Sequence, residues 1–427
     1  MDNRRYWAVK AVIEAEKGGY SQLVADSVLK ECNLEEQERR FVSALFYGVC
    51  ERHETLVRVL QMYNSKKMDT AVRAILLTGI YQLLYMKTIP PSAAVNESVK
   101  LCKEFKKTSA GSFVNGILRS FIRDGLKLPQ GKNETDELAL EFSCSYDVAE
   151  AFTRWLGRDG AKSALESALG MPPIFIRVNT LKTHWVDLIA ALKKEGIQAE
   201  ETDIEGCLKA YGNVAHNRAF KAGFFTVQDK LSQIAALSLP VKAGDRVLDI
   251  CAAPGGKAFL LAQKMENKGS ITCSDISLGR LALVEETAKR LGISIIKLLE
   301  NDGRVFSEEL AAEKFDAILC DVPCSGLGVI RRKPELKYRT EEEFNRFSVL
   351  QYEILENASK YLKVGGTIVY STCTLNPAEN EENIKRFLTN HENYVEKPFE
   401  NGEFIIKNPI GNMGGDGFFI ARMEKKA

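Results

Sequence analysis

The chain has 427 residues, of which 45% are hydrophobic, 27% charged and 9% aromatic. This globular composition excludes disordered and fibrous proteins, and at about 100 to 200 residues per domain the length predicts two to four domains. The net charge of +1 favours no particular partner. The longest mostly apolar run, Ala74 to Tyr85, is broken by polar residues and is shorter than the ~18 residues that predict a membrane span, so we expect no membrane contact.

The N-terminus and the cysteines predict a cytoplasmic protein. Residues 1–5 lead into a charged amphipathic pattern that lacks the apolar stretch of a secretory signal. The ten cysteines lie between Cys32 and Cys373 without paired spacing, which favours free thiols in a reducing compartment. The four histidines are too scattered to form a recognisable ligand set, so we predict no metal.

Residues 1–128 predict an all-helical bundle. Apolar residues recur there at spacings of three and four, and Ile89 to Ser92 forms a break before helices expected over Ala93–Phe105 and Gly111–Ile122. Residues 1–129 hold 20 lysines and arginines against 14 acidic residues, a net charge of +6, whereas the remainder carries −5. This asymmetry suits contact with a polyanion such as RNA, and a solvated helical surface is the alternative.

The helical segment resembles the NusB-like RNA-binding domain. The residues that carry the resemblance are Arg39 to Val42, Arg73 to Leu77, Asn96 to Val99 and Phe113 to Arg119. Because their apolar members are expected in the core, we expect basic side chains elsewhere to contact RNA phosphates. The candidates are Arg4, Arg5, Arg39, Arg40, Lys106 and Lys107.

Two shorter segments follow. Residues 129–170 begin with the polar stretch Pro129 to Asp136 and are expected to form a linker and a short helical region. Residues 171–235 predict a small α+β module that positions RNA, because Arg177 to Asn179 and Val227 to Asp229 are similar to the module before the catalytic domain of RNA cytosine-5 methyltransferases. The elements expected in this module are strands over Ile174–Asn179 and Phe224–Val227 and a helix over Trp185–Lys194.

Residues 236–427 predict a doubly wound parallel sheet, in which short apolar strands alternate with helical stretches. The strands are expected over Arg246–Ile250, Ser270–Cys273, Ile293–Leu298, Phe315–Cys320 and Thr367–Tyr370. Ligands of such sheets bind outside the carboxyl ends of the strands, so the residues directly after each strand should hold the chemistry.

The loop after the first of these strands, Cys251 to Lys257, consists of small residues that let a ligand approach the backbone. A phosphate-binding loop ending at Lys257 would need glycine at 251 and serine or threonine at 258, and the chain has Cys251 and Ala258. The glycine fingerprint of dinucleotide sites is also missing. Asp275, 18 positions beyond Lys257, follows the second strand, where a carboxylate can bind ribose hydroxyls. The arrangement fits S-adenosylmethionine.

Two cysteines, Cys324 and Cys373, follow the fourth and fifth expected strands and can face one pocket. Carbon 5 of cytosine is a poor nucleophile, so its methylation needs a group that first adds to carbon 6. A thiolate suits this step because it is nucleophilic near neutral pH and can leave again. Methylation of an exocyclic amine needs no thiol, and enzymes of that kind usually carry an Asn/Asp-Pro-Pro-aromatic loop where this chain has Asp321 to Cys324. The pattern favours cytosine-5 methylation.

Four motifs resemble the RNA cytosine-5 methyltransferase family, namely Asp249 to Lys257, Asp321 to Gly326, Ile330 to Pro334 and Tyr370 to Thr374. With its NusB-like front, the chain resembles the RsmB (Sun, Fmu) family of bacterial 16S ribosomal RNA cytosine-C5 methyltransferases. The resemblance implies a multidomain protein with an all-α NusB-like bundle, a small α+β module and a C-terminal α/β Rossmann-like methyltransferase domain that depends on S-adenosyl-L-methionine.

The resemblance also implies roles for single residues. Cys373 would be the nucleophile, Cys324 would aid proton removal and enzyme release, and Asp321 would lie near the cofactor and the target base. The residues implied to contact the cofactor are Cys251, Ala252, Ala253, Pro254, Gly255, Gly256, Lys257, Asp275, Arg280, Asp302 and Asp321. The implied partner is ribosomal RNA, with 16S as the expected target, and the sequence indicates neither a protein partner nor the target nucleotide.

Two charged runs near these motifs receive different interpretations. Arg331, Arg332 and Lys333 directly follow the Pro-Cys loop and are expected to contact RNA phosphates, with a solvated charge run as the alternative. Glu379 to Glu382 predicts the acidic first turn of a helix. For the whole chain two alternatives stay open, which are cytosine-C5 methylation of transfer RNA and a non-catalytic RNA-binding factor for ribosome assembly.

Overall fold

The computed structural model describes residues 3–215 and 217–427 and divides the chain into two compact units. The first, called here the helical unit, contains Met1–Leu169 together with Ile330–Glu341. The second, called the sheet unit, contains Gly170–Val329 and Glu342–Ala427. The chain therefore leaves the sheet unit after Val329, contributes a short segment to the helical unit and returns at Glu342.

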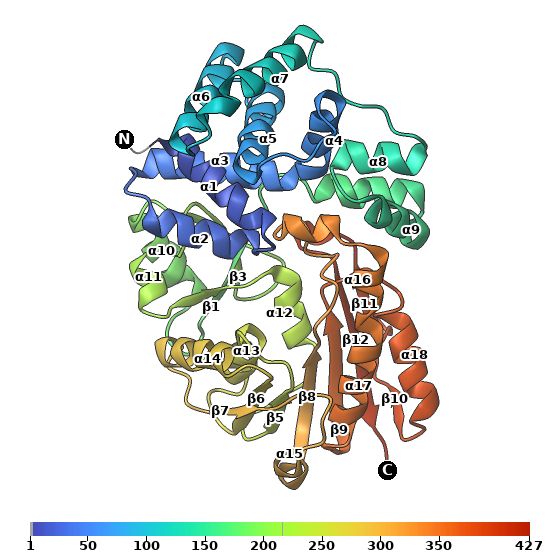
Figure 1. Cartoon of the computed structure of the whole chain (residues 1–427). Coiled ribbons are helices and arrows are strands. Elements are labelled where there is room, and N and C mark those ends of the chain that lie inside the picture. Colours follow the sequence, from blue (N-terminus) through green and yellow to red (C-terminus); the bar gives the residue numbers. More distant parts are fainter. Residues whose placement is uncertain (1–2, 216) are drawn as a thin grey trace. The chain divides into compact units, whose positions relative to one another are not determined.

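The first part of the helical unit is the predicted helical bundle (Figure 1). Its α-helices bury apolar side chains in a common core. Its elements are α1 (Arg4–Glu16), α2 (Ser21–Glu31), α3 (Glu36–Glu51), α4 (His53–Tyr63), α5 (Thr70–Tyr85), α6 (Pro91–Glu104), η1 (Thr108–Ala110) and α7 (Gly111–Arg123). Asp69 caps α5 by accepting hydrogen bonds from Ala71 N and Val72 N. Pro91 opens α6, as expected for a residue without a backbone N–H.

Two helices follow the bundle, α8 (Glu134–Phe142) and α9 (Tyr146–Ser167). The side chains of Asn133 and Ser145 cap their N-termini, so polar residues that suggest a loop also begin helices here. Helix α9 is kinked at Gly157, whose φ of 72° lies in the left-handed region that glycine tolerates. None of the described helices, α9 included, is both long and apolar enough to cross a membrane.

The sheet unit begins with a small antiparallel sheet of order β2-β3-β1-β4. Ile176 and Val178 of β1 pack on Leu188 and Leu192 of α10, which confirms the predicted α+β arrangement. The elements are β1 (Ile174–Val178), α10 (Trp185–Lys194), β2 (Gln198–Glu201), β3 (Cys207–Tyr211), α11 (Arg218–Lys221) and β4 (Phe225–Val227), followed by α12 (Lys230–Leu237).

A large, mostly parallel sheet of order β10-β12-β9-β8-β5-β6-β7 forms the rest of the sheet unit. Val247 and Leu248 of β5 enter different buried clusters on its two faces, as successive strand residues must. The predicted Rossmann-like fold is thereby confirmed. The elements are β5 (Arg246–Asp249), α13 (Gly256–Lys264), β6 (Ser270–Asp275), α14 (Leu278–Leu291), β7 (Ile296–Glu300), α15 (Glu308–Glu313), β8 (Phe315–Asp321), η2 (Pro334–Tyr338, in the helical unit), α16 (Glu341–Asn345), α17 (Phe347–Ser359), β9 (Leu362–Thr372), α18 (Glu381–Asn390), β10 (Tyr394–Glu396), β11 (Ile405–Asn408), η3 (Asn412–Gly414) and β12 (Phe418–Lys425).

Two features of the sheet differ from the expectation. Strand β7 begins at Ile296 because Gly292, with φ of 76°, ends α14 and Ile293 N still donates to Ala288 O of that helix. Strands β10, β11 and β12 form an antiparallel extension beside β9 that was not predicted. The short β10 and β11 carry too few residues for a periodic pattern, so only pairing with β12 defines them.

Candidate active site

The strand order of the large sheet defines one site at its carboxyl edge. Strand β5 pairs in parallel with β6 on one side and with β8 on the other, so the connections run in opposite directions from β5. Ligands of open sheets bind at such a reversal, outside the carboxyl ends of the strands. The loop Cys251–Lys257 follows β5 and the run Asp321–Cys324 ends and follows β8, so both lie at this edge.

The loop from Cys251 to Lys257 is held by backbone hydrogen bonds. Ala252 N donates to Ser274 O over 2.9 Å, and Gly255 N donates to Ala252 O over 2.6 Å. Gly255 has φ of +95°, and a Cβ at this position would overlap the Phe259 ring. Gly256 then begins α13. The loop is therefore a tight turn of small residues at the carboxyl edge of the sheet, and its contact with a cofactor stays a prediction.

Asp275 and Arg280 brace this loop. Asp275 is 4% exposed at the end of β6, where its Oδ2 accepts from Ala253 N over 3.2 Å and its Oδ1 accepts from Ser277 N over 3.1 Å. Arg280 donates to Asp275 over 3.3 Å and to Ala253 O over 2.5 Å. The structure thus places two of the predicted cofactor residues, Asp275 and Arg280, in hydrogen bonds with the predicted cofactor loop.

Asp302 lies beyond the carboxyl end of β7 and is paired with Arg304. The guanidinium reaches both carboxylate oxygens, at 3.0 Å from Nε to Oδ1 and 2.6 Å from Nη2 to Oδ2. The hydrogen bonds from Arg304 hold the pKa of Asp302 below its ordinary value. Asp302 is therefore an ionised acceptor at the same edge as Asp275.

A second group of carboxylates connects β5 with β8. Lys257 Nζ lies 2.5 Å from Asp321 Oδ2, and Ser371 Oγ donates to Asp321 Oδ1 over 2.7 Å. Asp249 is 1% exposed, and burial together with the charge of Asp321 raises its pKa to about 8. Its Oδ1 has no hydrogen-bond partner among the described residues. Within that part of the chain, no group of three or more His, Cys, Asp or Glu side chains is arranged to hold a metal ion.

Cys324 and Cys373 follow the neighbouring parallel strands β8 and β9, and their Sγ atoms lie 3.2 Å apart. The hydrogen bond to Cys373 and burial raise the pKa of Cys324 well above its ordinary value. The two sulfur atoms are therefore close enough to share one hydrogen bond, in which either thiol can be the donor. All ten cysteines are free, and burial also raises the pKa of Cys251, so that thiol stays protonated.

Comparison with known proteins agrees with this geometry. Residues 236–424 match the family model of 16S rRNA methyltransferase RsmB/F, and residues 2–123 match the NusB family model. The chain is 35% identical over 437 residues to the probable ribosomal RNA small subunit methyltransferase B of Bacillus subtilis (strain 168), with 98% of each chain covered. The chain belongs to the RsmB/F family of 16S rRNA methyltransferases.

Further relatives extend over nearly the whole of this RsmB/F family member. The ribosomal RNA small subunit methyltransferase B of Escherichia coli O1:K1 / APEC is 31% identical over 444 residues, with 99% of each chain covered. Among solved structures, PH0851 is 28% identical, with a TM-score of 0.88 and 99% of each chain covered. NSun6 from Pyrococcus horikoshii with SFG is 25% identical, with a TM-score of 0.60, covering 66% of this chain and 98% of that one.

Glu379 is a residue of this methyltransferase whose position the sequence pattern did not reveal. It was expected in the first turn of a helix, but α18 begins at Glu381, so only Glu381 and Glu382 occupy that acidic turn and the interpretation of Glu379 was wrong. Glu379 is completely buried, and burial raises its pKa. A polar run between a strand and a helix carries no periodic signal that would mark one of its acids as buried.

The Glu379 carboxylate braces the loop that carries Cys324. Its Oε2 accepts from Ser325 N over 2.9 Å and from Gln351 Nε2 over 2.8 Å, and its Oε1 accepts from Asn376 Nδ2 over 3.1 Å. The Ser325 and Thr374 hydroxyls are themselves hydrogen-bonded over 2.7 Å. The residues next to the two cysteines are thus joined to each other and to one buried carboxylate.

Glu379→Gln should loosen the Cys324 loop. The amide keeps the shape of the side chain but turns an NH₂ group toward one of the donors, which should cost about 1 to 3 kcal/mol of stability. Thermal unfolding should show the loss, and mass spectrometry should show faster iodoacetamide labelling of Cys324. Glu382→Gln, in the exposed first turn of α18, is the control and should leave both quantities unchanged. Equal behaviour of the two variants would contradict the bracing role.

The predicted RNA contacts of this family member fall in two places, both in the helical unit. Arg331, Arg332 and Lys333 lie in the segment Ile330–Glu341, with the two arginines half-buried and the lysine exposed. Arg4, Arg5, Arg39 and Arg40 lie on α1 and α3, while Lys106 is exposed and Lys107 pairs with Asp69 over 2.7 Å.

The arginines of α1 and α3 differ in exposure. Arg4 lies 4.1 Å from the centroid of the Phe41 ring, and Arg40 is exposed and pairs only with Glu36 at 3.2 Å among the ion pairs of the described residues. Arg5 instead donates to Gln82 over 2.7 Å, and burial lowers its pKa. Arg5 is therefore hydrogen-bonded within the bundle, and the phosphate contacts of these arginines stay a prediction.

The double variant Arg4→Ala/Arg40→Ala should flatten the salt dependence of RNA binding. Each lost phosphate contact with a single strand lowers the slope of log affinity against log salt by about 0.7, so the pair should remove about 1.4. RNA affinity measured across a salt series gives this slope. Lys162→Ala on α9 removes an exposed cation elsewhere in the unit and serves as the control. A slope that changes equally in both proteins would exclude these arginines as specific contacts.

Proposed function

We propose that this methyltransferase transfers a methyl group from S-adenosyl-L-methionine to carbon 5 of a cytosine in 16S ribosomal RNA through a covalent cysteine adduct. The observation that carries the proposal is the pair of sulfur atoms, Cys324 and Cys373, 3.2 Å apart beside Asp321. A second thiol has no use in methylation of an amine or a ribose hydroxyl. A second thiol is useful where one thiolate adds to a ring carbon, because that thiolate must later be released from the base.

The residues at the carboxyl edge fit the proposed cofactor. Among the described residues Asp249 Oδ1 is a buried polar atom without a hydrogen-bond partner, and Asp249 ends β5 directly before the loop that would hold the cofactor. Asp275 would accept the ribose hydroxyls, and Asp302 adds a second carboxylate, with the loop Cys251–Lys257 between them and β8. When bound, S-adenosyl-L-methionine supplies an electrophilic methyl group.

The two cysteines and Asp321 divide the reaction between them. Cys373 adds to carbon 6 of the base, which gives carbon 5 the electron density that it needs to accept the methyl group. Asp321 accepts a hydrogen bond from the base, since a carboxylate pairs with the exocyclic amine of cytosine. In the adduct the Cys373 sulfur is bonded to carbon 6 and its thiol no longer raises the pKa of Cys324, so Cys324 can act as the thiolate that takes the proton from carbon 5. The electron pair of that C–H bond then forms the 5,6 double bond, and Cys373 leaves carbon 6 as a thiolate.

The division of labour along the chain follows from the same proposal. Residues 1–128 bind RNA as a NusB-like domain, residues 129–170 connect that domain to the rest, residues 171–235 position RNA and residues 236–427 hold the chemistry. Membership of a 16S rRNA methyltransferase family supports ribosomal RNA over transfer RNA as substrate. The acidic residues at the carboxyl edge and the two cysteines argue against an RNA-binding factor without catalytic activity.

A methyl-transfer assay tests the proposed function. Purified protein with methyl-labelled S-adenosyl-L-methionine should label small-subunit ribosomal RNA, and bisulfite sequencing should place the mark at a cytosine that is unmodified in cells lacking the protein. Label in transfer RNA alone would favour the second substrate. Tight RNA binding with no cofactor binding by calorimetry would favour the non-catalytic factor.

Asp275→Ala should weaken cofactor binding by about 1.5 to 3 kcal/mol, the range for a hydrogen bond to a charged group, which is roughly 10- to 150-fold in Kd. Isothermal calorimetry measures this directly. Asp245→Ala is the matched control, because Asp245 accepts from Lys242 N over 2.9 Å at the opposite, amino end of β5. Unchanged affinity in Asp275→Ala, or an equal loss in both variants, would remove Asp275 from the cofactor site.

A further inference from the structure

Two threonines, Thr372 and Thr374, flank Cys373 where β9 ends. Both are completely buried, so the polar groups that they bring into the interior need partners. The Thr374 hydroxyl shares a hydrogen bond with the Ser325 hydroxyl, as described above. The Thr372 hydroxyl and the Thr374 carbonyl have a common partner instead, which is Asn380.

The side chain of Asn380 joins the two threonines. Its Oδ1 accepts from Thr372 Oγ1 over 2.6 Å, and its Nδ2 donates to Thr374 O over 3.0 Å. A carbonyl oxygen can only accept, so the second bond determines which end of the amide faces which threonine. One amide group therefore binds the residues on both sides of Cys373.

Asn380 stands at the N-cap of α18, where an asparagine side chain ordinarily accepts from an N–H of the first helical turn. Its backbone does begin the helix, because Ile384 N donates to Asn380 O over 3.1 Å. Among the described residues, however, its side chain makes no capping hydrogen bond. The amide is used for the turn that carries Cys373 and not for the helix that it precedes.

The backbone that carries this amide is itself fixed. Asn380 N donates to Pro377 O over 3.1 Å, and the Tyr370 hydroxyl donates to Glu379 O over 2.5 Å. Tyr370 belongs to β9, the strand that ends directly before Cys373. Asn380 is also completely buried, so water does not compete for its two hydrogen bonds.

A further hydrogen bond fixes the peptide of Cys373. Gly328 N donates to Cys373 O over 2.9 Å. A Cβ at Gly328 would lie 2.1 Å from Gly417 O and 2.8 Å from Cys373 O, so only glycine allows this close approach. Residues 372, 373 and 374 are therefore all hydrogen-bonded to parts of the chain outside the turn.

We propose that Asn380 is a positioning residue for the attack of Cys373 on carbon 6 of the base. The inference rests on the proposed function, in which a bond forms between the Cys373 sulfur and carbon 6 while the electron pair of the 5,6 double bond moves to carbon 5. A cysteine side chain has one rotatable bond to its sulfur, so a fixed backbone leaves the sulfur only three staggered positions. A displacement of about 1 Å at a reacting group can cost about 10²-fold in rate.

The chemistry of the Asn380 amide favours positioning over simple packing. An apolar side chain of similar size would fill the same space and would need no partners. A buried amide whose donor and acceptor are both used instead specifies one arrangement of the groups that it binds. A turn that moved away from Asn380 would leave Oδ1 and Nδ2 without these partners.

Substitutions in the full-length chain test this role. Thr372→Val keeps the shape of the side chain and removes the hydroxyl, and Asn380→Ala removes both hydrogen bonds to the turn. Thr372→Ser keeps the hydroxyl and should behave as the wild type does. Thr367→Val is the matched control on β9, because the buried Thr367 Oγ1 accepts from Lys397 Nζ over 2.8 Å, away from the turn.

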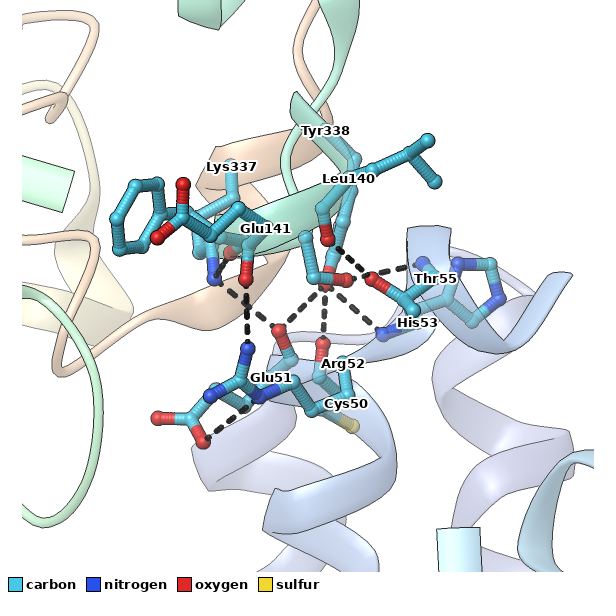
Figure 2. A network of polar contacts seen from close by, with 11 residues as sticks. Cys50, Glu51, Arg52, His53, Thr55, Leu140, Glu141, Lys337 and Tyr338 are labelled. Atoms are coloured by element: carbon cyan, nitrogen blue, oxygen red, sulfur yellow. Dashed lines mark hydrogen bonds and ion pairs between the residues drawn. The ribbon is translucent and has the colours of Figure 1, made fainter. Parts of the chain in front are cut away.

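A second control lies in the helical unit. Thr55 Oγ1 donates to Leu140 O over 2.9 Å between α4 and α8, as a dashed line in Figure 2 marks. Thr55 is 1% exposed, so Thr55→Val makes the same change in a similarly buried place. This variant measures how the loss of one buried hydrogen bond affects the protein when the turn is not involved.

Hydrogen–deuterium exchange measures the restraint on the turn without RNA or cofactor. Peptides that cover residues 372–376 should exchange several-fold faster in Thr372→Val and Asn380→Ala, and at the wild-type rate in Thr372→Ser and both controls. In single turnovers with saturating RNA and cofactor, Thr372→Val and Asn380→Ala should transfer the methyl group about 10- to 100-fold more slowly. The Kd values for RNA and for cofactor should not change.

Four results would contradict the positioning role. They are an equal loss of rate in Thr367→Val or Thr55→Val, a wild-type rate in both turn variants, a loss that appears in Kd, and a Thr372→Ser variant as slow as Thr372→Val. If Asn380→Ala does not fold, the two Thr372 variants decide. Exchange at the wild-type rate in residues 372–376 of the turn variants would refute the restraint and leave the proposed function standing. A wild-type protein that transfers no methyl group would refute the proposed function and, with it, a part for Asn380 in attack.

Discussion

Cys373→Ala is expected to lose methyl transfer by about 10⁴-fold or more and to form no covalent RNA adduct. Without the thiolate nothing adds to carbon 6, so carbon 5 stays unreactive, and loss of a nucleophile costs factors of this size in other enzymes. Cys324→Ala should still allow attack and methyl transfer but should stall release, leaving RNA attached to Cys373. Denaturing gels with labelled RNA would show this as a retarded, protease-sensitive band.

A third thiol provides the control for this pair. Cys320 lies on β8, four positions before Cys324 in the sequence. Its side chain is buried in the core on one face of the sheet. Cys320→Ala should therefore keep turnover and lose only some stability. An adduct in Cys373→Ala and none in Cys324→Ala would reverse the two roles. Full turnover in both Cys373→Ala and Cys324→Ala would contradict a mechanism that uses a thiol and would favour methylation of an amine or a ribose hydroxyl.

Asp321→Asn is expected to lower kcat/KM for RNA by about 10²-fold or more. The carboxylate is held in place by Lys257 and Ser371, one on each oxygen, and would also accept a hydrogen bond from the cytosine amine. Asparagine keeps one acceptor oxygen and turns an NH₂ group toward at least one of these donors. Steady-state kinetics with RNA as the varied substrate give the ratio. The expected loss is smaller than for Cys373→Ala because the nucleophile is still present.

The same strand supplies the control for Asp321. Asp316 is the second residue of β8 and Asp321 is its last. Asp316 too has two partners, since it accepts from Arg246 N over 2.9 Å and pairs with Lys363 over 2.6 Å. Asp316→Asn should therefore lower stability without lowering kcat/KM. Equal losses in the two variants would mean that the strand, and not the position of one carboxylate, accounts for the effect.

The sequence could predict that the catalytic motifs meet at one edge of a sheet, because the strands that precede them are recognised from local hydrophobic patterns. Short apolar runs with helical stretches between them determine a parallel sheet, and all its strands end at one edge. For that reason Lys257, Asp321 and Cys373 could be assigned to one site although 116 positions separate the first from the last. The structure adds that Lys257 binds Asp321, which no periodicity encodes.

The burial of charged side chains could not be predicted in the same way. Lys337 and Glu379 stand in polar runs that suggest a solvated surface, yet both are buried. A charge is buried only where partners distant in sequence satisfy it, as the carbonyls of Glu51 and Phe142 do for Lys337. Such partners are known only once the chain is folded.

The sequence by itself determined the helical bundle, the parallel strands of the large sheet and the residues that follow them, because hydrophobic periodicity and strand ends are local properties. Tertiary structure alone decided that Ile330–Glu341 joins the helical unit, and that Glu379 braces the loop of Cys324. Both depend on hydrogen bonds between residues far apart in the chain. These hydrogen bonds stabilise the fold by replacing water at buried donors and acceptors. That stabilisation exists only once the chain is packed.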